Sequence, residues 1–587
     1  MADILLIQPP IRDFYLTAKR TIPYGLACIA ASLIKEGFSV EILDGLATSK
    51  SRIIPWPEEM SYLREYYGKA DFSPFALFHS FKHFGYSFQH LGEAAKRSGA
   101  FLVGISSLFT AYSTEALQTA EAVRAAHPHC RIVVGGHHAT EMPERVLQCG
   151  AVDFVLRGEG EVSMPKLARA LREKTSLESV PGIVHRKIDR SIRLSPPALM
   201  EDLDLYPLPA MSLIQQKHYQ RSRKAGTVVM ASRGCPMQCT YCSMGASSCI
   251  SYRRRSVDRV LHEIEVAVLQ QGAGFIDFED ENISLQKDWF LELLKGIREL
   301  CRRGAEHHQG SSSNLPHRLI PHLTFGHDTA PDPKPSSPCW GEGLGKDSSQ
   351  SFITPELRAM NGLFPPTLDE EVVKTMKEAG FKTLNLSLGT TSQEQLRSFR
   401  RPDVVRAFDA ALSHAEKYGL EAVGYIIVGA PGQTAADSIS DLLFLASRRV
   451  LAGVSVYYPS PGSVDFKKCE EAGILPSRLS LMRSTAIPIS HTTTREESVT
   501  LLRLGRILNF IKLLQSTENS PIAPSPLQTQ NLSGIVDRME KGRILLQSFL
   551  HDGIIRGVSP EGEVYTHKTS HSLCKMFIAG LKKLGIF

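Results

Sequence analysis

Three of the 11 cysteines lie close together, at Cys235, Cys239 and Cys242, with the spacing CxxxCxxC. They follow directly after an apolar stretch that reads as a strand. Thiolates bind soft metals such as iron, and a four-iron cluster needs ligands that converge from a compact loop. Three thiolates leave one iron without a protein ligand, like the open position of a catalytic metal site. The spacing therefore predicts a 4Fe-4S cluster with one corner free for a small molecule.

Two rival roles for these cysteines need a fourth ligand at a suitable position. A ferredoxin-type electron carrier supplies a fourth cysteine in a characteristic run, and Cys249 does not fit that run. A zinc knuckle needs a further Cys or His at short spacing, and the sequence has none there. The remaining cysteines are scattered and are expected to be buried small residues or idle thiols. A non-enzymatic iron–sulfur electron carrier stays open as an alternative.

The cysteine segment resembles the signature of the radical S-adenosylmethionine (SAM) enzymes. Similar stretches follow in the family's order: Tyr252–Ser256, Phe278–Asn282, Ser387–Thr390, Gly429–Thr434 and Tyr457–Gly462. The resemblance implies that the free iron chelates SAM and that reductive cleavage yields a 5′-deoxyadenosyl radical. Gly389 departs from the pattern, because the family often has an acid there. The positions that the resemblance assigns to SAM binding are Tyr241, Asp280, Glu281, Ser387, Gly429 and Pro431.

Strand and helix patterns alternate over residues 1–175, which predicts a doubly wound, Rossmann or flavodoxin-like parallel sheet. The expected strands are Ile4–Gln8, Phe38–Leu43, Phe101–Ser106, Arg131–Val134 and Asp153–Leu156. Ligands of such sheets bind beyond the carboxyl ends of the strands. Those ends carry Pro9, Pro10, Ser106, Ser107, Gly135, Gly136, Gly158 and Glu159. We expect the glycines to let the backbone approach a bulky ligand.

The rest of the chain divides into a connector, a second α/β series and a terminal region. Residues 176–222 form the proline-containing connector, and residues 223–465 alternate again, which predicts a partial (β/α)6 barrel of the TIM type. Residues 303–352 interrupt the series with a Ser-, Gly-, Pro- and His-rich stretch, which predicts a disordered insertion. Residues 466–587 are expected to be mainly helical. Residues 46–95 form a long aromatic-rich connection without a clear pattern.

A doubly wound domain followed by such a barrel looks like the cobalamin-binding subclass of radical SAM enzymes. The resemblance implies cobalamin at the strand ends named above and, most often, methylation of an unactivated carbon of a small molecule. Cobalamin-linked cyclisation or rearrangement without methyl transfer is the alternative. The cobalt-ligating DxHxxG motif is absent; His137 and His138 are alternative ligands, but a His after a Gly pair is more often a polar loop residue. A methylthiotransferase is less expected, because the N-terminal cysteines Cys28, Cys130 and Cys149 do not resemble that family's triad.

Composition limits the remaining classes of protein. The net charge of +6 over 587 residues is a weak excess, so no nucleic-acid partner is expected. The apolar run at the N-terminus is too short for a signal peptide, and no run of 18 apolar residues occurs. We therefore expect a cytoplasmic protein without a transmembrane segment. The resemblance also implies a flavodoxin or ferredoxin as electron donor.

Overall fold

The computed structural model describes residues 2–15, 21–221, 224–246, 251–310, 354–517 and 522–587. Its N-terminal sheet has seven strands in the order β10-β9-β8-β7-β6-β1-β3. These strands are β1 (Ile4–Gln8), β3 (Val40–Asp44), β6 (Leu102–Ser106), β7 (Arg131–Gly135), β8 (Phe154–Leu156), β9 (Ile183–Arg186) and β10 (Ile192–Leu194). The first five in chain order run parallel, and β9 and β10 are antiparallel at one edge.

Helices cover both faces of this sheet, because its central strand is apolar on both faces. The helices are α1 (Tyr24–Lys35), α3 (Phe88–Ser98), α4 (Ser113–Ala126), α5 (His137–Glu141), α6 (Pro143–Leu147) and α7 (Gly160–Glu173). Leu5 and Ile7 pack with α3 and α4, whereas Ile4 and Leu6 pack with α1 and α7. The predicted doubly wound sheet is confirmed, with two antiparallel edge strands that the sequence pattern did not indicate.

The second α/β unit is an open barrel of six parallel strands. Its strands are β12 (Lys224–Val229), β15 (Ala273–Phe278), β16 (Glu356–Ala359), β17 (Thr383–Gly389), β18 (Glu421–Val428) and β19 (Leu451–Val456). Two isolated parallel bridges, Leu357 to Phe381 and Leu363 to Leu386, connect β16 to β17. The outer helices are α9 (Val257–Glu265), α10 (Lys287–Gly310), α11 (Glu370–Ala379), α13 (Val405–Lys417), α14 (Ala435–Ala446) and α16 (Arg495–Thr517). The predicted (β/α)6 barrel is confirmed.

Shorter elements complete the barrel around the cysteines. They are β11 (Gln220–Arg221), β13 (Ser232–Arg233), α8 (Ser243–Ala246), β14 (Arg253–Arg254), α12 (Gln393–Phe399) and α15 (Val464–Glu471). The helix α10 continues to Gly310, so the first residues of the expected insertion are helical. The rest of that insertion, residues 311–352, lies outside the described residues. Strand β16 begins just after it and was not predicted.

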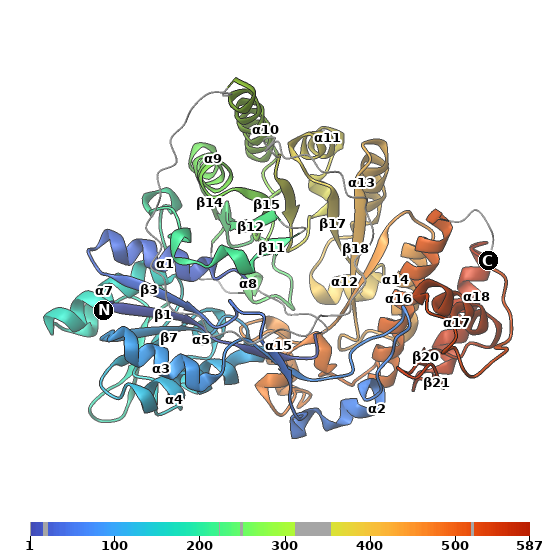
Figure 1. Ribbon diagram of the computed structural model, residues 1–587, viewed down its shortest axis with the longest axis horizontal. Helices are drawn as coiled ribbons and strands as arrows, with labels where there is room; N and C mark the ends of the chain where they lie inside the picture. The colour runs from blue at the N-terminus through green and yellow to red at the C-terminus, as the bar shows by residue number, and fades with distance from the viewer. Residues whose placement is uncertain (1, 16–20, 222–223, 247–250, 311–353, 518–521) are drawn as a thin grey trace.

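The connection over residues 46–95 is ordered by partners that are distant in sequence. It contains β4 (Ser51–Ile53) and β5 (Lys82–Phe84), which form a small sheet with β2 (Ile11–Asp13), and the short helix α2 (Arg64–Tyr67). Its aromatic side chains, such as Tyr67 and Phe75, belong to the same apolar core as the barrel and the C-terminal region. Figure 1 shows this segment running beneath the barrel to the C-terminal helices.

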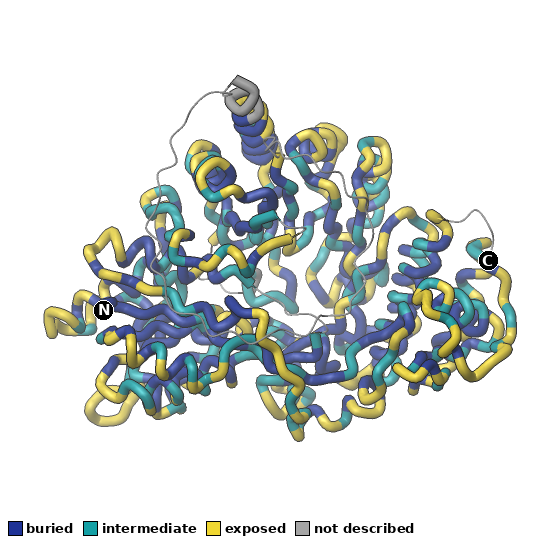
Figure 2. Tube along the Cα trace, in the orientation of Figure 1, coloured by how far each residue is buried: buried dark blue, intermediate teal, exposed yellow. Residues whose placement is uncertain are grey.

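The C-terminal region packs against the barrel on the side away from the N-terminal sheet (Figure 1). After α16 it consists of α17 (Arg538–Asp552), β20 (Arg556–Val558), β21 (Val564–Thr566) and α18 (His571–Lys583). Figure 2 shows that the central strands of the N-terminal sheet are mostly buried, whereas exposed residues gather on the outer helices and loops. Among the described residues, none of the helices combines the length and apolar character that crossing a membrane requires.

Candidate functional site

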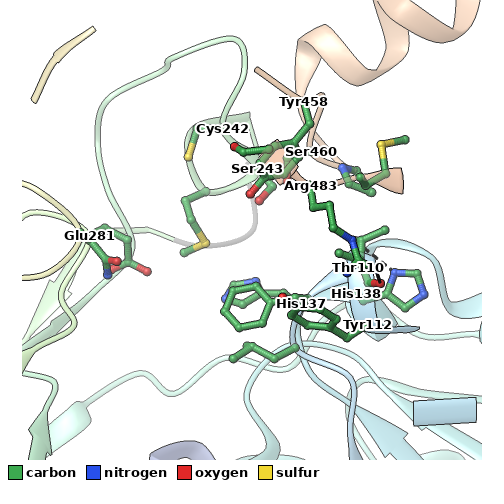
Figure 3. Close-up of a pocket in the computed structure, with 18 of the residues that line it drawn as sticks. Thr110, Tyr112, His137, His138, Cys242, Ser243, Glu281, Tyr458, Ser460 and Arg483 are labelled. Atoms are coloured by element: carbon green, nitrogen blue, oxygen red, sulfur yellow. Dashed lines mark hydrogen bonds between the residues drawn. The ribbon is translucent and has the colours of Figure 1, made fainter. Parts of the chain in front are cut away.

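A cavity of about 830 Å³ lies between the carboxyl ends of the N-terminal sheet and the barrel. One wall consists of residues that follow β1, β6 and β7, and the opposite wall contains the cysteine loop, which we define as residues 234–242. Figure 3 shows Cys242 and Ser243 on one side of this space, with His137 and Tyr112 on the other. Glu281 lies at one end of the space. The cavity therefore joins the two regions that the sequence marked for cofactors.

The entry to the cysteine loop is held by Asp280, which follows β15. Its carboxylate accepts hydrogen bonds from the backbone N–H of Ala231 at 3.2 Å and from the hydroxyl of Ser232 at 2.6 Å. Burial raises the pKa of Asp280 to about 7, although these hydrogen bonds oppose the shift. Gly234 then turns the chain with a φ of +80°, a backbone conformation that favours glycine. Asp280 thus holds the residues that precede the loop and does not line the cavity.

The far end of the loop is held by Thr240. Its backbone N–H donates to the carbonyl of Phe399 at 3.0 Å, at the end of α12. Its hydroxyl lies 3.1 Å from both the carbonyl oxygen of Ser398 and the carboxylate of Asp465, which begins α15. The backbone N–H of Asp465 returns a hydrogen bond to the Thr240 carbonyl at 2.9 Å. Two helix ends of the barrel therefore fix the loop between its second and third cysteines.

All three cysteines of the loop line the cavity. Burial raises the pKa of the Cys235 thiol, and the nearby thiols of Cys242 and Cys239 add to the shift. Three thiolates this close repel one another, so a bound metal would stabilise their ionised forms. In the described part of the chain, no three Cys, His, Asp or Glu side chains converge on a single ion. A four-iron cluster does not require such convergence, because each thiolate binds a different iron.

Two charged side chains on the cavity wall have polar atoms without a partner. The Oε2 atom of Glu281 is buried and accepts no hydrogen bond from the described residues, and burial raises the pKa of this carboxyl. The Nε atom of Arg401 is likewise buried without an acceptor among them. Buried polar atoms are normally paired, so both atoms indicate a missing ligand. A carboxylate and a guanidinium are suited to the amino and carboxylate groups of an amino acid.

Arg401 is a site residue that the sequence patterns did not identify. Its Nη1 donates to the Tyr241 hydroxyl at 2.7 Å, and its Nη2 donates to the carbonyl of Ser387 at 3.0 Å. A Cβ atom added to Gly389 would lie 3.3 Å from the Arg401 Nε atom. The guanidinium therefore lies beside the position where the family often has an acid. No local motif marks it, because a tertiary contact places it against the strand β17.

The wall on the N-terminal side is partly polar and partly apolar. Of the predicted residues, Pro9, Pro10, Ser106 and Ser107 line the cavity. Leu108 and Phe109 follow them and are 40% and 53% exposed, which is unusual for large apolar side chains that face a cavity. A bulky ligand with apolar edges would cover them. This observation fits a corrin ring at the carboxyl ends of these strands.

Two histidines follow β7 on the same wall. His138 is buried, and its Nδ1 atom lies 3.2 Å from the hydroxyl of Thr110. Burial, with the charge of Arg145, lowers the pKa of His138 to about 4, so its imidazole is neutral at pH 7. His137 projects toward the cavity (Figure 3) with its side chain accessible, and desolvation by the surrounding walls, with the charge of Arg233, lowers its pKa. Both side chains line the cavity as neutral imidazoles.

Several residues that were predicted to contact a cofactor do not line the cavity, and two of them lie at close contacts between backbone segments. A Cβ atom on Gly136 would lie 2.6 Å from the Ser107 carbonyl oxygen, and one on Gly158 would lie 2.2 Å from the Ala198 carbonyl oxygen. These two glycines lie where two backbone segments approach each other closely. The predicted residues that do not line the cavity are Asp280, Gly135, Gly136, Gly158, Glu159, Gly429 and Pro431.

The chain matches two family models. Residues 76–168 match the B12 binding domain, and residues 352–445 match the Radical SAM superfamily. The first match covers the strands β6 to β8 and the helix α7, and the second covers the barrel from β16 to α14. Together with the cysteine loop and the open barrel, these matches define the class: the protein is a radical SAM enzyme.

Relatives and solved structures agree with this assignment. An uncharacterized methyltransferase of Pyrococcus horikoshii is 24% identical over 468 residues, which span 78% of this chain and 81% of the relative. The cytidylyl-2-hydroxyethylphosphonate methyltransferase of Streptomyces wedmorensis is 23% identical, over 82% of this chain and 84% of that one. The radical SAM methyltransferase TsrM from Kitasatospora setae has a similar fold, with a TM-score of 0.56 and 16% identity over 100% of this chain and 91% of TsrM. The cobalamin-dependent S-adenosylmethionine radical enzyme OxsB also has a similar fold, with a TM-score of 0.57 and 13% sequence identity over 94% of this chain and 72% of OxsB.

The chain combines a B12 binding domain with a Radical SAM domain. Its cofactors are a 4Fe-4S cluster, SAM and cobalamin. The residue types on the cavity wall fit these groups: thiols for iron, an unpartnered acid and cation for an amino acid, and apolar side chains for a corrin.

Proposed function

We propose that the protein is a cobalamin-dependent radical SAM methyltransferase that methylates an unactivated carbon of a small molecule. The observation that carries this proposal is the shared cavity. The three cysteines and the carboxyl ends of the B12-binding sheet face the same space of about 830 Å³. A methyl carrier and a radical generator must both reach the substrate, and a common cavity permits this.

On the barrel side, Cys235, Cys239 and Cys242 would hold the cluster. When bound, the cluster and SAM supply a radical that removes hydrogen, and cobalamin supplies the methyl group. Glu281 accepts hydrogen bonds from the amino group of SAM, and Arg401 donates to its carboxylate. Both assignments follow from the unpartnered Oε2 and Nε atoms. Together the two side chains would hold the amino acid part of SAM beside the cysteine loop.

On the other side, Pro9, Pro10, Ser106 and Ser107 would contact the corrin. The serine hydroxyls can hydrogen-bond its peripheral amides, and Leu108 packs against its apolar edge. The substrate then occupies the remaining space near residues 482–485 from the C-terminal region, which also line the cavity. The barrel, the sheet and the C-terminal region together exclude water from the reacting groups.

Cyclisation or rearrangement is the second candidate function. It is favoured by one observation: an anaerobic magnesium-protoporphyrin IX monomethyl ester cyclase of Synechocystis is 30% identical, but over only 29% of this chain. The two methyltransferase relatives instead span about four fifths of this chain. Methyl transfer is therefore the better supported reaction.

The decisive experiment is anaerobic reconstitution with iron, sulfide and hydroxocobalamin, followed by incubation with a reductant and SAM labelled in its methyl group. A methyltransferase gives 5′-deoxyadenosine and labelled methylcobalamin. With candidate substrates, the product gains one labelled methylene equivalent. Deoxyadenosine without label in cobalamin or product would favour cyclisation, and the absence of SAM cleavage would exclude both reactions.

The cluster also requires an electron donor, and a flavodoxin or ferredoxin is the class we propose. A cytoplasmic location suits such a partner and keeps the thiols of the cysteine loop reduced. The reconstituted enzyme should cleave SAM when a reduced flavodoxin or ferredoxin replaces the chemical reductant. Cleavage with the chemical reductant but with neither protein would contradict this choice of partner.

A further inference from the structure

Buried ion pairs join the cysteine loop to the N-terminal domain, and the mechanism above does not use them. Arg233 lies two residues before Cys235, and its Nη2 atom is 2.6 Å from a carboxylate oxygen of Glu161. Its Nη1 atom is 3.2 Å from a carboxylate oxygen of Glu159. Both glutamates follow β8 of the cobalamin-binding domain. The three charged side chains are between 6% and 19% exposed, so the pairs are largely shielded from water.

A second arginine strengthens this connection. The strands β13 and β14 pair in antiparallel register with Arg233 opposite Arg253. Arg253 reaches Glu159 through two nitrogens, at 2.9 and 3.0 Å, and also donates to the carbonyl of Met200 at 2.6 Å. Burial opposes ionisation of Glu159, but the hydrogen bonds from Arg253 and the charge of Arg233 outweigh burial and lower its pKa. Glu159 is therefore fully charged at neutral pH.

The ion pairs of Arg233 differ from the other contacts that hold the loop, because their partners belong to another domain. Asp280 and Thr240 attach the loop to elements of the barrel. Arg233 instead attaches it to the neighbouring domain. Removing one partner of a buried ion pair leaves an uncompensated charge, which is strongly destabilising. Moving the loop away from the N-terminal domain is therefore costly.

We propose that Arg233 is a positioning residue that fixes the cysteine loop against the cobalamin-binding domain and thereby sets the separation of cluster and corrin. This inference rests on the proposed function, because the separation matters only if both cofactors serve one reaction. Displacements of about 1 Å between reacting groups can slow a reaction strongly. A loop fixed only to the barrel would leave the separation of cluster and corrin less well defined. Arg233 itself need not touch substrate or cofactor.

The test compares the full-length wild type with Arg233→Gln, Arg233→Lys and Glu161→Gln. Arg124→Gln is the matched control, because Arg124 forms a partly buried ion pair with Asp153. Asp153 directly precedes β8, so this pair lies at the amino end of the strand, whereas Glu159 and Glu161 follow its carboxyl end. Hydrogen exchange of residues 232–243 is first measured in the metal-free protein. We expect Arg233→Gln and Glu161→Gln to speed this exchange roughly tenfold or more, Arg233→Lys to speed it less, and the control to leave it unchanged.

The reconstituted proteins are then examined by pulsed electron paramagnetic resonance, which reports the dipolar coupling between the reduced cluster and cob(II)alamin. The wild type and the control should give one narrow coupling, and Arg233→Gln a broadened one with unchanged iron and cobalamin content. Wild-type exchange and wild-type coupling in Arg233→Gln would overturn the proposal. If Arg233→Gln fails to fold, Glu161→Gln decides in the same way. A wild type that binds no cobalamin would instead refute the proposed function, and the exchange measurement would still decide whether the loop is held.

Discussion

At the scale of single residues, Glu281 and Arg401 are two of the ionisable side chains on the cavity wall. Each has a buried polar atom without a partner in the described part of the chain, and each adjoins the cysteine loop or its supporting strands. Leaving such atoms unpaired costs free energy unless a ligand satisfies them. A ligand with one cationic and one anionic end, such as the amino acid part of SAM, meets both requirements.

Replacing Arg401 by alanine tests this assignment. A hydrogen bond to a charged group contributes about 1.5–3 kcal/mol, so the dissociation constant for SAM should rise about ten- to hundredfold. Isothermal titration calorimetry of SAM binding to the cluster-loaded protein measures this change in the dissociation constant. Arg397→Ala, at an exposed position of α12, is the control and should bind SAM like the wild type. Equal affinity in both variants would contradict the assignment.

His138 should make stability depend on pH. Its pKa is lowered to about 4, so the folded chain binds fewer protons at this site than the unfolded chain between about pH 6.5 and 4. Stability contributed by the neutral imidazole is therefore lost as the pH falls through that window. When the pH is lowered from 7 to 5, the free energy of unfolding should fall by about 2 kcal/mol more in the wild type than in His138→Gln. Urea unfolding at both pH values measures this, and exposed His129→Gln should behave like the wild type.

At the scale of elements, the barrel strands and helix ends together shape the cysteine loop. The carboxylate of Asp280 after β15 holds its entry, and α12 and α15 hold its far end. Protein contacts thus restrain both ends of the loop. A restrained loop loses less conformational entropy on binding a cluster than a flexible one would.

Asp280→Asn should weaken cluster retention. An asparagine amide offers only one acceptor oxygen, so it cannot accept all the hydrogen bonds from Ala231 and Ser232. We expect the variant to fold but to lose iron to a chelator several times faster than the wild type. Asp277→Asn, which breaks an ion pair with Arg358 on the neighbouring strand β16, is the control. Similar iron loss from both variants would show that the effect is not specific to the loop.

The sequence predicted the elements where the pattern is local and failed where the determinants are distant. The strand β1 was predicted with its observed bounds, because four buried apolar residues end at Pro9-Pro10. The β16 strand was missed because an irregular stretch precedes it. Arg401 was missed because only the folded barrel brings it to Tyr241. The glycines Gly136 and Gly158 were predicted to let a ligand approach, and the close contacts between backbone segments at both positions were not predicted.

At the scale of the whole molecule, one apolar core extends through the barrel, the segment before β5 and the C-terminal helices. Buried polar contacts reinforce it: Arg503 donates to the carbonyls of Tyr66 and Phe75, and His567 lies 2.9 Å from Asp71. Regions far apart in sequence therefore depend on one another for stability. We expect the barrel and the C-terminal region to unfold as a single unit.

Phe549→Ala tests this expectation. Phe549 is 1% exposed in α17, and removing a buried phenyl ring costs about 3–5 kcal/mol. The melting temperature of the barrel should fall together with that of the C-terminal helices, as followed by calorimetry and by exchange of the β17 and β18 amides. Met576→Ala, at a residue 45% exposed on α18, should leave both unchanged. A separate early transition confined to the C-terminal helices would contradict a shared core.

The path of residues 46–81 beneath the barrel has a consequence during synthesis. These residues leave the ribosome well before the helices that cover Tyr67 and Phe75. The N-terminal sheet can close while the aromatic segment is still exposed and liable to aggregate. The aromatic segment therefore needs protection until these helices have been synthesised, and the barrel can complete its core only then.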